Sequence, residues 1–250
     1  TSKKVFEFTF KMLTQGKIAV PAEGMGAISE QLAAGARAAG AEIHTDEVVT
    51  AVRGDAESNF GDTEPTLSLG DETVTADAVV VATDPKSARE LTDVRSIPTD
   101  ERGCVTQYVS LDEPLSAGKR ILLNAADDAP NEVVPLSTVA PEYAPPDREL
   151  LGATFLGVPD RSDADLAGEV RRTLAAWYPE RTFPDLELEH TARVPFAQFA
   201  QPPGVFDGLP DNRAPARRSV YLAGDYTEAS SLNAAMESGR TAARAVYEDL

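Results

Sequence analysis

Apolar residues recur at helical spacing early in the chain, after an apolar and aromatic start at Val5–Leu13. The helical set is Met25, Ile28, Leu32, Ala36 and Ala39. Gly40 follows directly, where a glycine commonly ends a helix. The pattern therefore predicts a helix with one apolar face that stops at Gly40.

Short runs of β type follow this helix. They cover residues 41–45, 48–53, 66–69, 72–75 and 77–82. The last run is largely apolar, as is typical of a strand covered on both faces. Gly54–Pro65 holds charged and turn residues with little apolar content, which predicts an exposed hairpin loop.

The middle of the chain has a different pattern, with strand-like runs separated by Pro, Gly and Asp clusters. These runs are 104–111, 120–124, 132–139, 150–158 and 186–194. A single helix interrupts them: Ser162 caps its start with Asp165 in a capping box, and Pro179 follows its end. A mainly antiparallel sheet with one helix is predicted here.

The C-terminal segment predicts a strand and an acidic turn within Val220–Thr227, followed by a long helix. The positions expected to form the buried face of this helix are Leu232, Ala235, Met236, Gly239, Ala242, Ala243, Val246, Tyr247 and Leu250. The small Gly239 and Ala243 are expected to let the helix lie close against a sheet.

Together these elements predict an α/β plus α+β fold. Residues 1–96 with 195–250 are expected to form one layered α/β unit, and residues 97–194 an inserted, mainly antiparallel domain. No internal repeat stands out, so a solenoid or propeller is not expected.

The strongest candidate site is the start of the C-terminal helix. Backbone N–H groups at Leu232–Ala235 are expected to point outward at the positive end of the helix dipole, which suits a pyrophosphate. Asp225 precedes them and can accept hydrogen bonds from a sugar or polyol hydroxyl. The alternative interpretation is a plain turn from strand to helix.

Two segments resemble a known superfamily. Residues 223–243 read AGDYTEASSLNAAMESGRTAA, which resembles the C-terminal flavin-binding motif of flavin amine oxidases, protoporphyrinogen oxidases and phytoene-type desaturases. Pro21–Gly26, with the helix and strands up to Thr83, is similar to the middle segment of that superfamily in order and spacing. The matches cover roughly residues 18–90 and 194–250.

This resemblance implies FAD as cofactor and assigns roles to particular residues. Val49 would contact the adenine region by its backbone, and Asp225 the ribityl or pyrophosphate part. The residues expected beside the pyrophosphate and the flavin ring edge are Ser231, Leu232, Asn233, Ala234, Ala235 and Met236. Those expected to line a substrate cavity in front of the ring are Phe196, Phe199 and Pro202. The alternative is that Val49 and both phenylalanines are ordinary core residues.

The sequence departs from the superfamily pattern in two places. Glu23 stands before Gly24, where paired glycines are usual, and no G-x-G-x-x-G fingerprint occurs in the chain. Gly24-Met25-Gly26 imitates the fingerprint only weakly, and Pro21 disfavours the alternative of a nicotinamide-binding unit there. We therefore expect the C-terminal part of a longer flavoprotein, which a start at Thr1 fits.

The resemblance implies a reaction in which hydride is removed from an apolar small molecule such as a polyene or a porphyrinogen. The chain would be an FAD-dependent oxidoreductase if the missing fingerprint is present in the parent protein. The alternative is a non-catalytic nucleotide-binding or protein-interaction module derived from the same fold.

Composition narrows the partners further. With 23 basic and 41 acidic residues the net charge is −18, which argues against nucleic acid as a partner. Lysine supplies only six of the basic residues, a skew that suggests a halophilic source. Cys104 is the only cysteine, so no intrachain disulfide forms and a metal site is not expected. No membrane span or secretory leader is visible, so a cytoplasmic location is predicted, and oligomeric state is left open.

Overall fold

The computed structural model describes residues 2–15, 19–54, 64–125, 129–215, 217 and 219–250. The predicted hairpin loop at Gly54–Pro65 lies mostly outside them. Contacts divide the chain into two compact units. The first unit contains Thr1–Gln15, His44–Asp100 and Gln198–Leu250, and the second contains Gly16–Ile43 and Glu101–Ala197. The domain boundaries expected from the sequence, 1–96 with 195–250 and 97–194, stay a prediction.

In the first unit, β1 (Val49–Arg53), β2 (Thr66–Leu69) and β3 (Glu72–Thr75) form an antiparallel sheet in that order. These strands occur where the sequence predicts them. The run at 41–45 forms no strand. It contains Glu42, His44 and Thr45, and it leads directly to Asp46, whose φ is +64°.

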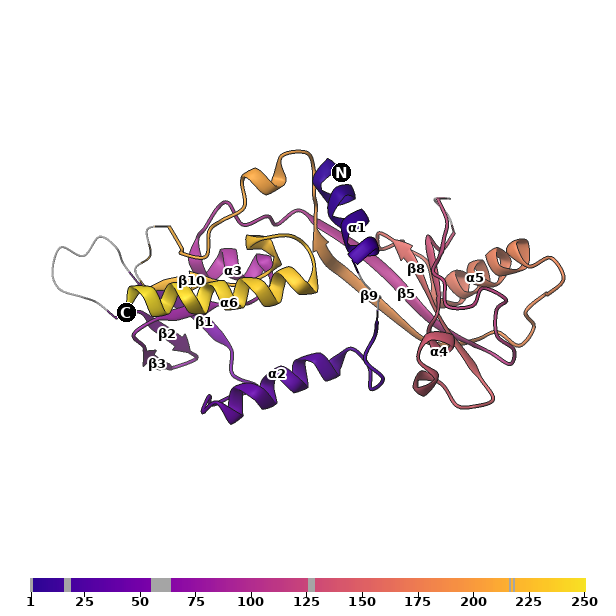
Figure 1. Cartoon of the computed structure of the whole chain (residues 1–250), viewed down its shortest axis with the longest axis horizontal. Helices are drawn as coiled ribbons and strands as arrows, with labels where there is room; N and C mark the ends of the chain where they lie inside the picture. The colour runs from indigo at the N-terminus through magenta and orange to yellow at the C-terminus, as the bar shows by residue number, and fades with distance from the viewer. Residues whose placement is uncertain (1, 16–18, 55–63, 126–128, 216, 218) are drawn as a thin grey trace. The chain divides into compact units, whose positions relative to one another are not determined.

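The centre of the first unit is a parallel pair of strands from distant parts of the chain. β4 (Val79–Val81) pairs with β10 (Val220–Leu222), so that Val220 lies opposite Val79 and Leu222 opposite Val81. Helix α6 (Leu232–Asp249) contacts β10 (Figure 1). Because parallel strands end at the same edge, the chain leaves β4 and β10 side by side, and the candidate site begins at this edge.

Helix α6 is buried on a narrower face than its sequence predicts. Its buried residues are Ser238, Ala242 and Ala245, whereas Leu232 is 60% and Tyr247 86% exposed. The helix has two adjacent apolar faces, and in this chain the face of small residues is covered while the face of large residues is open. The predicted close approach at Gly239 is wrong, because a Cβ there would have no atom within 4 Å.

Two further helices complete the first unit. α1 (Lys3–Gln15) forms from the aromatic start of the chain, and α3 (Pro85–Thr92) follows β4 directly. The hydrophobic pattern does not predict α3, although Asp84 and Pro85 are a standard helix start. Asp84 accepts hydrogen bonds from the N–H groups of Lys86 (2.9 Å) and Ser87 (3.1 Å).

The second unit contains a five-stranded sheet in the order β6-β7-β8-β5-β9. The strands are β5 (Glu101–Leu111), β6 (Leu122–Leu123), β7 (Glu132–Pro135), β8 (Glu149–Leu156) and β9 (Glu187–Phe199), of which the last two residues belong to the first unit. The predicted strand at 132–139 ends earlier, at Pro135, and continues as the short helix α4 (Leu136–Val139). The pairs β5–β8, β6–β7 and β7–β8 are antiparallel, as predicted.

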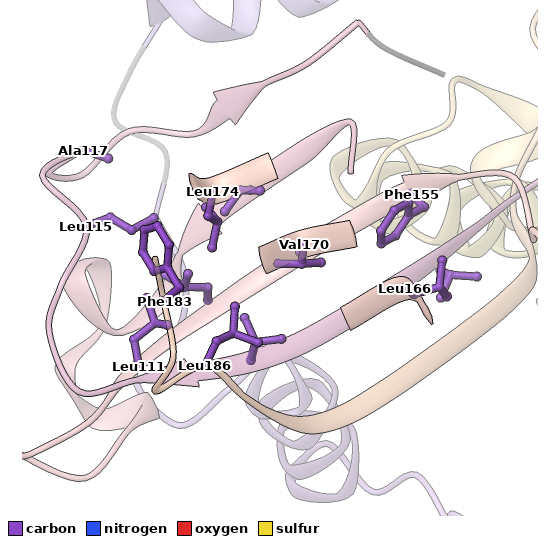
Figure 2. Packing of buried hydrophobic residues seen from close by; sticks show 14 residues of the cluster. Leu111, Leu115, Ala117, Phe155, Leu166, Val170, Leu174, Phe183 and Leu186 are labelled. Atoms are coloured by element: carbon purple, nitrogen blue, oxygen red, sulfur yellow. The ribbon is translucent and has the colours of Figure 1, made fainter. Parts of the chain in front are cut away.

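Helix α5 (Asp163–Trp177) covers one face of this sheet with Leu166, Val170 and Leu174, in a cluster that includes Val109 and Phe183 (Figure 2). Ser162 caps the helix as predicted, because its Oγ accepts from the N–H of Asp165 at 3.1 Å. Pattern and capping therefore predict this part of the second unit correctly.

Helix α2 (Gly26–Ala38) belongs to the second unit and ends near Gly40, whose φ is +95°. The predicted stop is confirmed, since glycine adopts this left-handed conformation without steric cost. The apolar face of the helix is not buried, since none of the residues of α2 is buried. Among the described residues, none of the helices is both long and apolar enough to cross a membrane.

Candidate active site at the start of helix α6

The site begins where β10 turns into a short 3-10 helix, η3 (Asp225–Thr227). The N–H of Ala223 donates to the carbonyl of Val81 (3.0 Å), which continues the parallel pairing to the last residue before Gly224. A Cβ on Gly224 would lie 2.2 Å from Cε1 of the Tyr226 ring. Glycine is therefore required here by the close approach of that ring.

Tyr226 lies within hydrogen-bonding distance of the ends of both parallel strands. Its side chain is fully buried, and its hydroxyl lies 3.2 Å from the carbonyl oxygen of Val81 and 3.1 Å from that of Ala223. Burial raises the pKa of the phenol well above its usual value, so the hydroxyl stays protonated and donates. Tyr226 thus supports the turn from within and is not available as a base.

Ser238 ties the first turns of α6 to the same turn. The N–H of Gly224 donates to its Oγ (2.8 Å), and that hydroxyl donates to the carbonyl of Ala235 (2.7 Å). The amide of Asn212 donates to the carbonyls of Leu222 (2.9 Å) and Ser238 (3.4 Å). Strand end, turn and helix start therefore form one hydrogen-bonded assembly.

Asp225 stands at the edge of this assembly and is partly buried. Burial raises the pKa of its carboxyl above the usual value, while hydrogen bonds from the Ser230 side chain and the N–H of Tyr226 lower it. No lysine or arginine in the described ranges forms an ion pair with it. A partly desolvated carboxylate without a cation is suited to accept hydrogen bonds from the hydroxyls of a ligand.

The start of α6 offers fewer free donors than the sequence predicts. Ser231 caps the helix: its Oγ accepts from the N–H of Ala234 (3.1 Å), and its carbonyl accepts from the N–H of Ala235 (3.0 Å). The expectation that all four N–H groups are open is therefore wrong for these two. The first two helical residues, Leu232 and Asn233, keep N–H groups without an intrahelical acceptor, as at any helix start.

The remaining predicted site residues lie in varied surroundings. Val49 is partly buried in β1 opposite Leu69, and Met236 is 48% exposed on α6. Phe199 is buried in the first unit, whereas Pro202 is exposed and Phe196 is partly buried in the second unit. Their roles toward a cofactor or substrate stay predictions.

Four further residues of the site have no role assigned from the sequence: Asn212, Tyr226, Ser230 and Ser238. The last three stand inside the quoted motif and Asn212 lies outside it. Hydrogen bonding across the turn depends on three-dimensional contacts that the sequence pattern does not show. Within the part of the chain that the structure describes, no three His, Cys, Asp or Glu side chains gather to hold a metal.

Comparison with known proteins places this geometry in a family. Residues 2–247 match the family described as flavin-containing amine oxidoreductase. The chain therefore belongs to that family, whose cofactor is FAD, as the C-terminal motif predicts. A search of curated proteins finds no match.

Solved structures agree on the fold. A candidate protoporphyrinogen oxidase from Exiguobacterium has 15% identity and a TM-score of 0.70, over 92% of this chain and 52% of its own. A Methanosarcina mazei oxidoreductase has 17% identity and a TM-score of 0.55, over 82% of this chain and 49% of its own. Glycine oxidase from Geobacillus kaustophilus has 21% identity and a TM-score of 0.52, over 88% of this chain and 53% of its own.

These similarities confirm the predicted fold class, and the chain spans about half the length of the structures it matches. The expected superfamily and FAD are also confirmed. At these identities the neighbours show the fold alone, so neither a substrate nor a reaction follows from their names.

Proposed function

We propose that this chain contributes one wall of the FAD site of an oxidoreductase that removes hydride from an apolar small molecule. The observation that carries the proposal is the partly buried Asp225, without an ion-pairing cation in the described residues, next to the first N–H groups of α6. This combination presents acceptors to hydroxyls and donors to an anion within a few residues, which a plain turn does not need.

The residues fit parts of FAD by their chemistry. Asp225 would accept hydrogen bonds from ribityl or ribose hydroxyls, and the N–H groups of Leu232 and Asn233 would donate to an oxygen of the pyrophosphate or flavin ring edge. Gly224 allows a close approach, while Tyr226 and Ser238 hold the turn. We keep Val49 as the proposed backbone contact to adenine and Ala234, Ala235 and Met236 as neighbours of the cofactor.

FAD held by Asp225 and the first N–H groups of α6 would supply the redox chemistry, as an acceptor of hydride from a C–H bond of the substrate that oxygen, a quinone or another acceptor would reoxidise. A polyene or a porphyrinogen is the proposed substrate class, with Phe196, Phe199 and Pro202 as proposed cavity residues. A cytoplasmic location and a fingerprint supplied outside these 250 residues belong to the same proposal.

The test is to express the protein from its complete coding sequence, purify it and release any bound flavin with acid. We expect one FAD per chain, and Asp225→Ala should lower the affinity for FAD by about tenfold or more, as loss of a charged hydrogen bond does. Glu237→Gln is the matched control, because Glu237 is an exposed acid on α6 that pairs with Arg240.

A folded protein that contains no flavin and takes up none would overturn the proposal. That outcome would favour the non-catalytic module as the alternative. Equal affinity for FAD in the Asp225→Ala and Glu237→Gln variants would instead overturn the role of Asp225 alone.

A further inference from the structure

The first unit contains a pocket of about 420 Å³ that no predicted site residue lines. Helix α1, the end of β9, the short helix η2 (Val205–Asp207) and the loop before α6 all contribute to it. Its lining residues are Lys4, Val5, Phe8, Thr9, Gln198, Gln201, Phe206, Glu228, Ala229 and Ser230. Its volume is within the range of pockets that take small organic ligands.

The helical repeat of α1 explains the apolar wall. Val5 and Phe8 are three residues apart and line the pocket together, and Phe8 is 37% exposed, whereas Phe6 and Phe10 stack on each other and are 70% and 61% exposed. Phe206 of η2 supplies a second aromatic side chain. The pocket is therefore lined by two phenylalanines from distant segments, which suits a flat or extended apolar body.

Two contacts hold α1 in place beside the pocket. The Lys4 ammonium forms an ion pair with Asp207 at 2.7 Å, and the N–H of Ser2 donates to the carbonyl of Gln201 at 2.9 Å. The charge of Lys4 is thereby matched by a carboxylate beside the pocket. Lys4 is therefore not an unpaired cation that an anionic ligand could bind.

Apart from Lys4, which is paired with Asp207, the polar residues that line the pocket are neutral or acidic. Oε1 of Gln198 accepts from Nε2 of Gln201 (3.3 Å) and from the Ser230 hydroxyl in a long hydrogen bond (3.5 Å). Glu228 adds a carboxylate for which the described residues provide no ion pair. An anionic group would meet repulsion here, while an uncharged or cationic group could hydrogen-bond.

Ser230 connects this pocket to the candidate flavin site, because it lines the pocket and directly precedes Ser231, the N-cap of α6. We infer that the pocket is the part of the substrate compartment of the proposed flavoenzyme that adjoins the proposed cavity residues Phe199 and Pro202, which directly follow the lining residues Gln198 and Gln201, and that it binds an apolar, flat or extended molecule with an uncharged or cationic polar end. This inference rests on the proposed function. It favours a polyene or an amine over a porphyrinogen, which carries carboxylates.

The binding test uses two fluorescent probes that differ by a single sulfonate: N-phenyl-1-naphthylamine, which is uncharged, and 8-anilino-1-naphthalenesulfonate, which is anionic. Both are titrated into the purified protein, with and without FAD. We expect the uncharged probe to bind about tenfold more tightly than the anionic probe. Glu228→Gln should narrow this difference in affinity by several-fold, because it should raise the affinity for the anionic probe alone.

Variants locate the binding. Phe8→Ala should weaken the uncharged probe by about tenfold through lost apolar contact, whereas Phe10→Ala, on the exposed side of the same helix, should leave its affinity within about twofold. Ala229→Leu fills the pocket without removing packing and should also weaken binding. It keeps the inference testable if Phe8→Ala does not fold.

Equal loss in Phe8→Ala and Phe10→Ala, or full binding in Ala229→Leu, would overturn the inference. So would tighter binding of the anionic probe. The probe titration is carried out both without and with FAD, so it reports binding in the pocket independently of flavin. Loss of flavin binding is reported separately by the released-flavin measurement.

Discussion

Two glycines of the C-terminal motif have opposite surroundings at the scale of single residues. A side chain at Gly224 would collide with the buried ring of Tyr226, whereas one at Gly239 meets no atom within 4 Å. The Tyr226 ring cannot easily move aside, since its hydroxyl is hydrogen-bonded to the strand ends. The same residue type is thus structurally required at one position and replaceable at the other.

We predict opposite effects of alanine at these positions in this 250-residue chain. Gly224→Ala should lower the free energy of unfolding by about 1–3 kcal/mol, because it overpacks the turn. Gly239→Ala should raise it by about 0.5–1 kcal/mol, since alanine is the better helix former. Urea titration followed by circular dichroism measures both. A neutral Gly224→Ala variant would contradict the observed packing.

Asp225 should show a conflict between stability and ligand binding. Because burial raises the pKa of its carboxyl, the folded state holds the proton more tightly than the unfolded state. The stability this proton provides is present below the usual carboxyl pKa and is lost as the pH rises through the raised one. At neutral pH the ionised carboxylate is therefore a cost to folding.

Asp225→Asn should consequently keep or raise the melting temperature at pH 7, by up to about 2 °C, while it weakens FAD binding. Asp249 is the contrasting control: Arg213 lowers the pKa of its carboxyl, so Asp249→Asn should lower the melting temperature. Melting curves between pH 4 and 8 check both signs. A clear loss of stability in Asp225→Asn would refute the proposed cost.

Prediction from the sequence succeeded at these residues where the chemistry is local. The motif around Asp225 is contiguous, so its strand, turn and helix were predictable, and so was its resemblance to flavin proteins. Ser231 is also local, but its side chain and a ligand compete for the same N–H donors at the start of α6. The sequence pattern alone did not decide which of the two the N–H of Ala234 binds. The bonds of Tyr226 to Val81 in β4 and of Ser238 to the N–H of Gly224 join separate elements and were not predictable.

At the scale of elements, capping explains which helices form. α3 begins with Asp84 as N-cap and Pro85 in the first turn, and the Ser87 side chain and the N–H groups of Ser87 and Lys86 lower the pKa of the Asp84 carboxyl. The helix is only eight residues long, so its apolar period is too short to see in the sequence. Its start signal was the available evidence for it.

We predict that Asp84→Ala lowers the free energy of unfolding by about 1 kcal/mol at pH 7, the usual effect of losing an N-cap. The lowered pKa means that this contribution is present above the usual carboxyl pKa of about 3.9 and is lost as the pH falls through the folded value. The gap between the two proteins should close in acid. Glu90→Gln, on the exposed side of α3, should show no such gap in urea titrations at either pH.

Helical period alone did not decide which face of α6 or α2 is buried. In α6 the apolar residues span two adjacent faces, and burial follows the small residues that fit against β10. Leu232, Met236 and Tyr247 are apolar and regularly spaced yet exposed. Burial of these faces depends on what packs against them. This chain spans about half the length of its structural neighbours, so the helical period within it does not identify every packing partner.

At the scale of the whole molecule, the excess of acidic residues shapes the response to salt. The net charge of −18 produces repulsion that opposes the compact state. Ion pairs such as those of Arg148 with Asp112 and Glu187 attract and stabilise the compact state. They are partly exposed, however, and the described ion pairs are fewer than the carboxylates without a cationic partner. Screening should therefore remove more repulsion than attraction.

We predict that the melting temperature rises by about 5 °C or more between 0.05 and 1 M KCl, since the Debye length falls from over 10 Å to about 3 Å. Sucrose at matched osmolality controls for general exclusion of solutes, because it stabilises compact states without screening charge. The rise should be larger at pH 7 than at pH 4.5, near the sequence pI of about 4.5. A flat curve in KCl would contradict both the repulsion and the proposed adaptation to high salt, whereas equal rises at the two pH values would assign the effect to something other than net charge.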